Sequence, residues 1–519
     1  MDDPQSPTPT PYHLPTIGRR HKLFWRVVDQ YWELFLILTV MLKLALPMIS
    51  SRDFWYDESI SGVIIQQNWH NFFRLLMENP ANTQQPLYHI LAKVLSAPFG
   101  HSAAAIRGVS LLFGLALVIG VYLFCRELFN RTAATLAAFI AATSPFVLQY
   151  ATEARMYSLM GAVVIFAAIF QTRAVKTGRW VDHVLWGILM ALAVLAHYLA
   201  LIFIFLLLLA YPWQVANKKN QPTEGNGILA TARQVIGRLP KIGIALICGT
   251  IVFAPWLPVF IIEHVSRRNS WIPKPQVTDL TATVAIFLFG SFPGSLGMPS
   301  ATPLRIALLN ELTQYFVLPV LAIITTWLIA HNRRWRPGSA LCALLTFGSL
   351  SAAYLLMFGG SYFMVSRFLF PAALFLAALL GAFLAELRWG PRLAAIAAFA
   401  FLCTFRMPYD LPTGFTQLAR RPPDASHTLY LLNALDFNVA KFYFPKNSLA
   451  LYNISNPAEN FSGWETIEPF RRILTADEIT HNREGLVVLN ADHAPPENSF
   501  LDRFILIGQF DNLKLYRPR

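Results

Sequence analysis

Apolar residues gather in long runs that polar segments interrupt along most of the chain. A helix that crosses the roughly 30 Å hydrocarbon core of a membrane needs about 20 residues, and helices inside a bundle can be shorter. By this rule the pattern predicts about eleven transmembrane helices. They are centred near residues 32–50, 103–124, 132–149, 156–171, 184–197, 199–213, 242–262, 314–330, 339–358, 368–386 and 391–406, with a break at His197 and Tyr198 between the fifth and the sixth.

Two long connections depart from this pattern. In the connection 51–102, apolar residues from Ile60 to Leu76 recur at helical spacing with polar residues between them, which predicts an amphipathic helix in the membrane interface. Leu87, Leu91, Val94 and Leu95 predict a second such helix. The other connection, 264–312, contains RRNSWIPKP and FGSFPGSLGMPS, and we interpret it as a loop able to cover a site.

The pattern changes after about residue 408. Short apolar stretches, namely TLYLLNA, SLALYNI, GLVVLNA and FILIGQF, alternate with Pro, Asn, Asp and Gly turns. The segment 408–519 is therefore predicted to be a small α/β domain, and the fold class is an all-α polytopic membrane domain over 31–407 with this domain appended.

Composition agrees with a membrane protein. Hydrophobic residues make up 55% and charged residues 14% of the 519 residues, and the mean hydropathy is +0.45. The net charge of +13 comes from Lys and Arg clusters between apolar runs, so it does not indicate nucleic-acid binding. Under the positive-inside rule these clusters face the cytoplasm, with the N-terminal tail 1–30 inside, an uncleaved first span and the C-terminal domain outside.

Asp57 and Glu58 follow the first predicted span, within DFWYDES. A carboxylate pair at a membrane surface can accept a proton or hold a cation. Solvated interfacial charges or a helix cap explain the pair equally well when it is taken alone. The four cysteines show no metal-ligand or disulfide spacing, so no metal site is predicted from them.

Further charged residues fall at the predicted outer ends of spans. Glu153, Arg155 and Tyr157 lie in QYATEARMYSLM, where an Arg beside a phenol can bind phosphate or pair with the neighbouring Glu. Arg367, in SYFMVSRFLFP, is predicted to be functional. Arg267 and Arg268 can bind a substrate or extend to lipid headgroups, and His197 lies at a predicted outer turn and is interpreted first as structural.

The chain resembles the polyprenyl-phosphate-dependent membrane glycosyltransferases of the GT-C class, akin to protein O-mannosyltransferases and the lipid A aminoarabinose transferase. The resemblance rests on DFWYDES, QQPLYH, EARMYSL, HYLAL, APWLP and SRFLFPAALFLAALL, and it covers about residues 30 to 390. The family pattern at the second of these motifs is HPPLYY, from which Gln84 and Gln85 depart by replacing His and Pro.

The resemblance implies a role for each matching residue. Asp57 matches the catalytic base, Glu58 would assist it, and Arg155, Tyr157 and Arg367 would lie near the donor phosphate. Glu153, Gln85, Tyr88, His197, Arg267 and Arg268 are candidate substrate-binding residues. No cofactor is predicted. A divalent metal is left open, and the replacement of the usual His by Gln84 removes one potential metal ligand, which makes a metal requirement harder to argue from the sequence.

The implied function is transfer of a sugar from a polyprenyl-phosphate-linked donor to a lipid, polysaccharide or protein hydroxyl at the outer face of the cytoplasmic membrane. One carboxylate base without a second nucleophile predicts inversion by single displacement. A secondary transporter or lipid flippase is the main alternative, although its usual repeated halves and broken midplane helices are not evident. A non-enzymatic scaffold for the C-terminal domain is the third.

Overall fold

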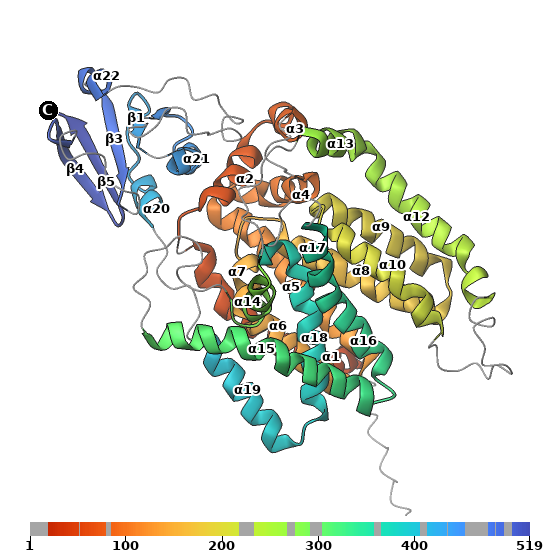
Figure 1. Cartoon of the computed structure of the whole chain (residues 1–519). Coiled ribbons are helices and arrows are strands. Elements are labelled where there is room, and N and C mark those ends of the chain that lie inside the picture. The colour runs from red at the N-terminus through yellow and green to blue at the C-terminus, as the bar shows by residue number, and fades with distance from the viewer. Residues whose placement is uncertain are drawn as a thin grey trace, which may run out of the picture.

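The structure is a computed structural model, and it describes residues 19–50, 52–78, 85–216, 233–266, 276–290, 304–357, 365–404, 413–432, 434–451, 476–482, 484–491 and 501–519. Within these ranges the chain forms a large helical body with a smaller unit containing a β-sheet at one end (Figure 1).

The helical body contains long and short helices. Their bounds are α1 Arg19–Ser50, α5 Ala103–Leu128, α6 Arg131–Thr143, α7 Pro145–Ala151, α8 Tyr157–Thr177, α9 Trp180–Ala196, α10 Ala200–Ala216, α12 Leu239–Phe253, α13 Leu257–Ser266, α14 Thr278–Phe289, α15 Leu304–His331, α16 Arg336–Ala343, α17 Ser349–Leu356, α18 Phe370–Glu386 and α19 Trp389–Thr404. Short 3₁₀ turns connect α12 to α13 and precede α18, and a π-helical turn joins α16 to α17.

Six helices of the described chain are long and apolar enough to cross a membrane, or up to seven if the bent pair α6 and α7 is one span. Shorter apolar helices, including α9, α10 and α19, coincide with further predicted spans. The break predicted at His197 and Tyr198 is present, because α9 ends at Ala196 and α10 begins at Ala200. The multi-pass helical architecture is confirmed, and the count of about eleven spans stays a prediction.

The connection after α1 holds three helices instead of the two that were predicted. They are α2 Tyr56–Gln66, α3 Trp69–Glu78 and α4 Pro86–Ser96. The predicted single helix from Ile60 to Leu76 was wrong, because the chain turns at Gln67 and Asn68. The side-chain oxygen of Asn68 accepts the backbone N–H of Asn71 and so caps the first turn of α3. The ammonium group of Lys93 binds the carbonyl oxygens of Ile65 and Gln67, so the end of α2 is closed by a side chain from α4.

The second long connection is also partly helical. Helix α14 lies inside the predicted loop 264–312, and α15 begins at Leu304, about ten residues before the predicted span. Helix α14 packs against α7 and α18, where the Phe146 and Phe287 rings lie 5.3 Å apart.

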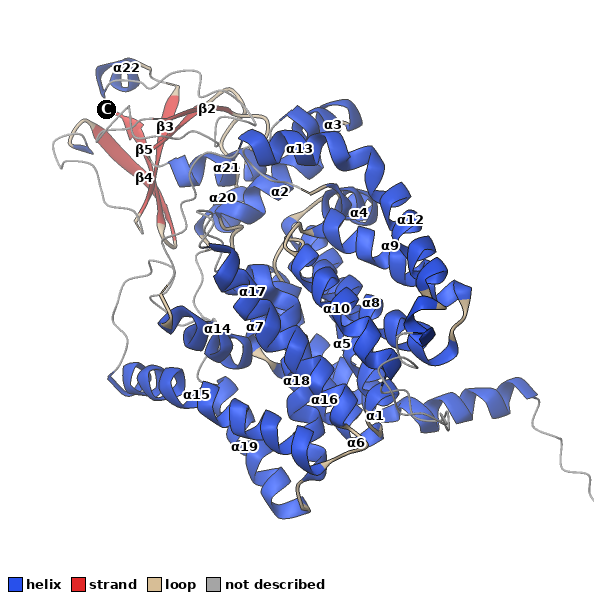
Figure 2. Cartoon of the chain, turned by 45° about the vertical axis from the view of Figure 1, so that its right-hand side comes forward, coloured by secondary structure: helices blue, strands red, loops and turns tan. Residues whose placement is uncertain are grey.

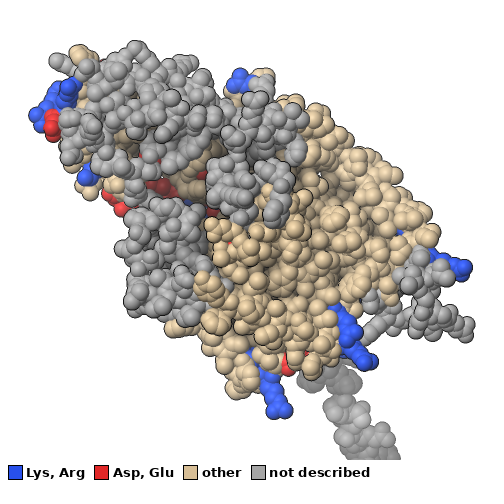
Figure 3. Space-filling view, viewed as in Figure 1, with Lys and Arg blue, Asp and Glu red and all other residues tan. Residues whose placement is uncertain are grey.

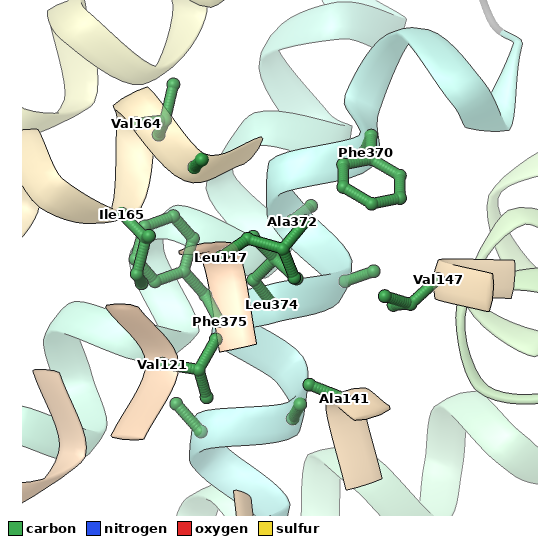
Figure 4. Packing of buried hydrophobic residues seen from close by; sticks show 14 of the residues in the cluster. Leu117, Val121, Ala141, Val147, Val164, Ile165, Phe370, Ala372, Leu374 and Phe375 are labelled. Atoms are coloured by element: carbon green, nitrogen blue, oxygen red, sulfur yellow. The ribbon is translucent and has the colours of Figure 1, made fainter. Parts of the chain in front are cut away.

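Helix α18 forms the centre of the helical body. Its buried side chains meet those of α5, α6, α7 and α8 in one apolar cluster (Figure 4). Gly381 lets α18 approach α6 closely, because a Cβ atom at this position would lie 2.6 Å from the backbone nitrogen and the Cβ atom of Ala137 in α6. Close packing of this kind is the usual source of stability between helices in a membrane, where lipid is as apolar as the helix surface.

The C-terminal unit carries the predicted sheet. Strands β1 Thr428–Leu431, β2 Ser448–Leu451, β3 Gly485–Asn490, β4 Phe504–Phe510 and β5 Leu513–Pro518 form it, with helices α20 Gly414–Ala419, α21 Ala434–Tyr443 and α22 Ala476–His481. The order is β2-β1-β3-β5-β4; the first three strands are parallel, and β5 and β4 are antiparallel. The four predicted apolar stretches are β1 to β4, and β5 was not predicted.

The sheet-bearing unit meets the helical body through two of its helices. Helix α21 packs against α2, and α20 lies beside them, between the sheet and the start of α2 (Figure 2). The C-terminal unit is therefore seated directly on the helix that carries Asp57 and Glu58.

Candidate active site

Glu58 is locked in place by a buried arginine. Both side chains are 0% exposed, and the guanidinium group of Arg107 in α5 donates to Oε1 at 2.8 Å and to Oε2 at 2.6 Å. The backbone N–H of Ala154 also donates to Oε1, at 2.8 Å. Arg107 uses its other donors on the carbonyl oxygens of Ile49, Arg52 and Asp53, so the pair ties the ends of α1, α2 and α7 together.

This environment keeps Glu58 ionised. Burial alone would raise its pKa, but the charge of Arg107, its hydrogen bonds and the nearby Arg52 together lower the pKa below the usual value. A fully buried, fully bonded carboxylate has no free oxygen for a substrate proton. Glu58 therefore organises the start of α2, and the assisting role that the resemblance implied stays a prediction.

Asp57, one residue earlier, has a different environment. Its side chain is 21% exposed, and its Oδ2 atom lies 3.5 Å from Nη2 of Arg367, whose side chain is 10% exposed. Arg155 donates to the backbone carbonyl of Asp57 and to Oγ of Ser61, both at 3.2 Å. The fold thus brings together Asp57, Arg155 and Arg367, which are far apart in the sequence.

Aromatic rings orient the Arg367 side chain. The guanidinium carbon lies 5.3 Å from the ring centroid of Trp55 and 5.6 Å from that of Phe368. Such packing holds the planar group in one orientation.

Glu153 and Tyr157 add buried polar atoms to the same place. Oε1 of Glu153 and the hydroxyl of Tyr157 are buried without a hydrogen-bond partner among the described residues. Burial, reinforced by the charge of Glu58, raises the pKa of Glu153 to about 8, although Arg367 and Arg52 oppose the shift. Buried polar atoms left unbonded beside charged groups are typical of a site that a ligand completes.

The other predicted site residues lie at different distances from this cluster. His197 is near it, with its ring 5.2 Å from Phe368 and 6.1 Å from Tyr157. The Tyr88 hydroxyl is buried and bonded to Ser110, whose Oγ atom donates to the Arg155 carbonyl, so Tyr88 supports the loop behind Arg155. Gln85 is buried at the start of α4. Arg267 and Arg268 lie outside the described residues.

Two arginines of the site were not identified from the sequence. Arg107 had been taken as part of an apolar span, and Arg52 as part of a connection; the latter donates to the Thr152 carbonyl at 3.1 Å. A signal existed for Arg107, because a charged residue within an apolar span needs a buried partner. The sequence could not show that this partner is Glu58.

On the face drawn in Figure 3, acidic atoms are visible in a recess between the sheet-bearing end and the helical body, and Lys and Arg atoms are visible at both ends. A partly exposed carboxylate can deprotonate a hydroxyl, and the two arginines beside it can bind an anionic group. Among the described residues, no group of three or more His, Cys, Asp and Glu side chains is arranged to hold a metal ion.

Comparison with known families gives a partial match. Residues 83–232 match the family described as dolichyl-phosphate-mannose-protein mannosyltransferase. A search of curated proteins finds no match. The matched range includes Arg107, Glu153, Arg155 and Tyr157 and ends before Arg367.

Solved structures share the fold over most of the chain. The crystal structure of ArnT from Cupriavidus metallidurans in the apo state matches with a TM-score of 0.59 and 13% identity, covering 95% of this chain and 98% of that chain. The same protein bound to undecaprenyl phosphate gives 0.58 and 14% identity, covering 94% and 98%.

A third match is more distant. The archaeal oligosaccharyltransferase AglB from Archaeoglobus fulgidus, in complex with an inhibitory peptide and a dolichol-phosphate, gives a TM-score of 0.50 and 16% identity and covers 90% of this chain and 70% of that chain. With the family match, these likenesses confirm the resemblance to polyprenyl-phosphate-dependent membrane glycosyltransferases of the GT-C class.

Proposed function

We propose that this chain is a glycosyltransferase that moves a sugar from a polyprenyl-phosphate-linked donor to an acceptor hydroxyl at the outer face of the cytoplasmic membrane. One observation carries the proposal: the partly exposed carboxylate of Asp57 lies 3.5 Å from the Arg367 guanidinium. A base and an anion-binding group are thus neighbours at the end of the helical body on which the C-terminal unit is seated.

The phosphate of the donor would bind to the positive side of this cluster. Arg155 and Arg367 supply guanidinium groups, and the unbonded hydroxyl of Tyr157 supplies a neutral donor. Glu153 does not cancel their charge near neutral pH, because its pKa is raised to about 8 by burial and the charge of Glu58. The ArnT structure bound to undecaprenyl phosphate and the AglB structure with a dolichol-phosphate support a ligand of this class.

The reaction would be a single displacement. The acceptor hydroxyl gives its proton to an Oδ atom of Asp57, and its oxygen forms a bond with the anomeric carbon. The bond from that carbon to the phosphate oxygen breaks, and the electron pair leaves with the lipid phosphate. Charge that grows on the leaving oxygen is stabilised by preorganised guanidinium groups, which favours the transition state over the ground state.

Inversion at the anomeric carbon follows from this mechanism. Glu58 cannot act as a second, nucleophilic carboxylate, because both its oxygens are bonded to Arg107 in a fully buried position. A product with the donor's configuration retained would contradict single displacement, whichever sugar is transferred.

The decisive experiment compares cells with the wild-type gene, without it, and with Asp57→Asn. Mass spectrometry of surface glycolipids, glycans and proteins identifies the added sugar and its acceptor. We expect the added mass to disappear without the gene and to fall by about 10²-fold or more with Asp57→Asn, the usual contribution of a general base.

Asp424→Asn is the matched control for this substitution. Asp424 is an exposed carboxylate that caps a turn at Ser426 in the C-terminal unit, so its loss should leave the added mass unchanged. Transfer at the wild-type rate by Asp57→Asn would exclude Asp57 as the base. Unchanged surface molecules in the strain without the gene, together with a transport defect, would favour the transporter or flippase alternative.

A further inference from the structure

Asp53 links the acidic segment to the C-terminal unit. Its Oδ2 atom accepts the backbone N–H of Phe415 and its Oδ1 atom accepts that of Thr416, both at 2.7 Å. These donors belong to the first turn of α20, so a side chain four residues before Asp57 caps a helix more than 350 residues later. The carboxylate is buried, which makes both bonds costly to lose.

Aromatic packing forms a second link. The ring of Phe54 lies 4.4 Å from that of Phe442 in α21, and its backbone N–H donates to the Tyr443 hydroxyl at 3.2 Å. Gly62 of α2 makes room for this contact, because a Cβ atom there would lie 2.6 Å from the Phe442 ring.

These contacts continue to the site itself. The Phe54 ring also contacts the guanidinium group of Arg107, whose central carbon lies 4.8 Å from the ring centroid. Arg107 in turn holds Glu58. The side chain of Tyr56, next to Asp57, is hydrogen-bonded to Asn438 of α21. Contacts from α20 and α21 therefore reach residues 53, 54 and 56 on one side of Asp57 and Gly62 on the other.

We propose that α20 and α21 are positioning elements of the active site, and that they hold the segment 53–62 so that the Asp57 carboxylate faces the Arg367 guanidinium. Asp53 and Phe442 are the positioning residues, because each joins the C-terminal unit to this segment without reaching the reacting atoms. The expected loss of sugar transfer rests on the proposed function. The expected change in the structure of the segment 53–62 rests on the contacts alone.

The structural consequence is tested by hydrogen exchange of the purified full chain. We expect Asp53→Asn to speed amide exchange in peptides from both 52–66 and 413–419. The asparagine side chain has one acceptor oxygen, so it cannot accept both the Phe415 and the Thr416 N–H groups. Peptides from α5 should exchange as in the wild type. The milder variant Tyr443→Phe removes the hydroxyl that accepts Phe54 N–H and that lies 3.2 Å from Oγ1 of Thr416, and it leaves both backbone bonds from α20 to Asp53 in place. It should speed exchange in 52–66 more than in 413–419. Unchanged exchange in 52–66 for both variants would overturn the proposal.

The functional consequence is tested by two readouts on the same variants. We expect binding of undecaprenyl phosphate to the purified protein to stay within about twofold of wild type, while sugar transfer falls by about 10-fold to 100-fold, as expected when a catalytic group is displaced by about 1 Å. Asp424→Asn, which removes an exposed negative charge from the same unit and keeps the oxygen that accepts from Ser426, should change neither readout.

Size complementation between α2 and α21 separates positioning from a general loss of stability. Gly62→Ala should lower transfer because its methyl group meets the Phe442 ring, and Phe442→Ala combined with Gly62→Ala should transfer faster than Gly62→Ala alone. Equal rates for all these variants and the wild type would overturn positioning while the glycosyltransferase function stands. A wild-type protein that binds no polyprenyl phosphate and adds no sugar would instead overturn the function.

Discussion

Glu153 differs from the other carboxylates of the site in the way it is buried. Glu58 is compensated by Arg107 and backbone donors, and Asp57 is partly exposed beside Arg367. Oε1 of Glu153 has no hydrogen-bond partner among the described residues, and its pKa is raised to about 8, chiefly by burial and then by the charge of Glu58. At neutral pH this residue is therefore mostly protonated, and it adds little negative charge beside the arginines.

This protonation predicts a pH-dependent stability. Below the ordinary pKa of 4.5 Glu153 is protonated in both the folded and the unfolded chain, so its stabilising contribution is complete. As the pH rises towards about 8, the unfolded chain ionises first and the contribution is lost. Glu153→Gln carries a neutral amide at every pH, so its melting temperature relative to the wild type should rise between about pH 5 and pH 9.

Asp182→Asn is the matched control for Glu153→Gln. Asp182 is also buried, but its carboxylate accepts the hydroxyl of Thr177 at 2.6 Å. Its melting temperature over the same pH range gives the baseline for replacing a buried carboxylate by an amide outside the site. A constant difference for Glu153→Gln would show that Glu153 is ionised across the whole range.

The sequence identified residues but not their partners. Asp57, Arg155 and Arg367 could be selected because charges at the ends of apolar spans need a physical reason. Which carboxylate is locked and which is accessible depends on Arg107, forty-nine positions beyond Glu58. That pairing depends on the tertiary fold, which brings Arg107 of α5 to Glu58 of α2, and no local pattern in the sequence encodes it.

Among the elements, α9 and α12 approach each other closely at two glycines, Gly187 of α9 and Gly249 of α12. Gly187 lies against the backbone of Ala245, and a Cβ atom would overlap the carbonyl oxygen of that residue. Backbone cannot move aside as the end of a side chain can. We therefore expect Gly187→Ala to separate the two helices and lower the free energy of unfolding by about 1–3 kcal/mol, measured as a lower melting temperature.

Gly243→Ala in α12 is the matched control. A Cβ atom at this position meets nothing within 4 Å, so the substitution should be neutral or raise stability by about 0.5–1 kcal/mol through higher helix propensity. If both variants lowered the melting temperature equally, the close approach at Gly187 would not be what holds α9 and α12 together.

Element boundaries were predictable where apolar periodicity was long, and less so where side chains from elsewhere end a helix. The break between α9 and α10 was found because His and Tyr interrupt a continuous apolar run. The break between α2 and α3 was missed because Lys93, from α4, satisfies the last carbonyl groups of α2. Helix α14 was missed because Gly- and Pro-rich neighbours made its segment resemble a loop.

At the scale of the whole molecule, the architecture follows one axis. The sheet-bearing unit lies at one end of the helical body, acidic atoms lie in the recess beside it, and exposed Lys and Arg residues are visible at both ends (Figures 1 and 3). Strands β1 to β4 were predicted from their alternating pattern, whereas the seating of α21 on α2 required the structure.

This axis predicts the orientation of the chain in the membrane. Short connections rich in Lys and Arg stay in the cytoplasm, which would place Arg333 to Arg336 inside and the C-terminal unit outside. Ala425 and Arg334 are exposed positions at the two ends, so each can be replaced by cysteine and tested for reaction with a maleimide that does not cross membranes.

We expect Ala425→Cys to be labelled in intact cells and Arg334→Cys only after the membrane is permeabilised. The wild-type chain gives the background, because Cys125, Cys342 and Cys403 are buried and Cys248 is partly buried. Opposite labelling would place Asp57 on the cytoplasmic side, since α21 seats the C-terminal unit on the helix that carries it. A donor used at the outer face could then not reach this base. The side of the membrane on which residue 425 lies is therefore a direct test of the proposed reaction.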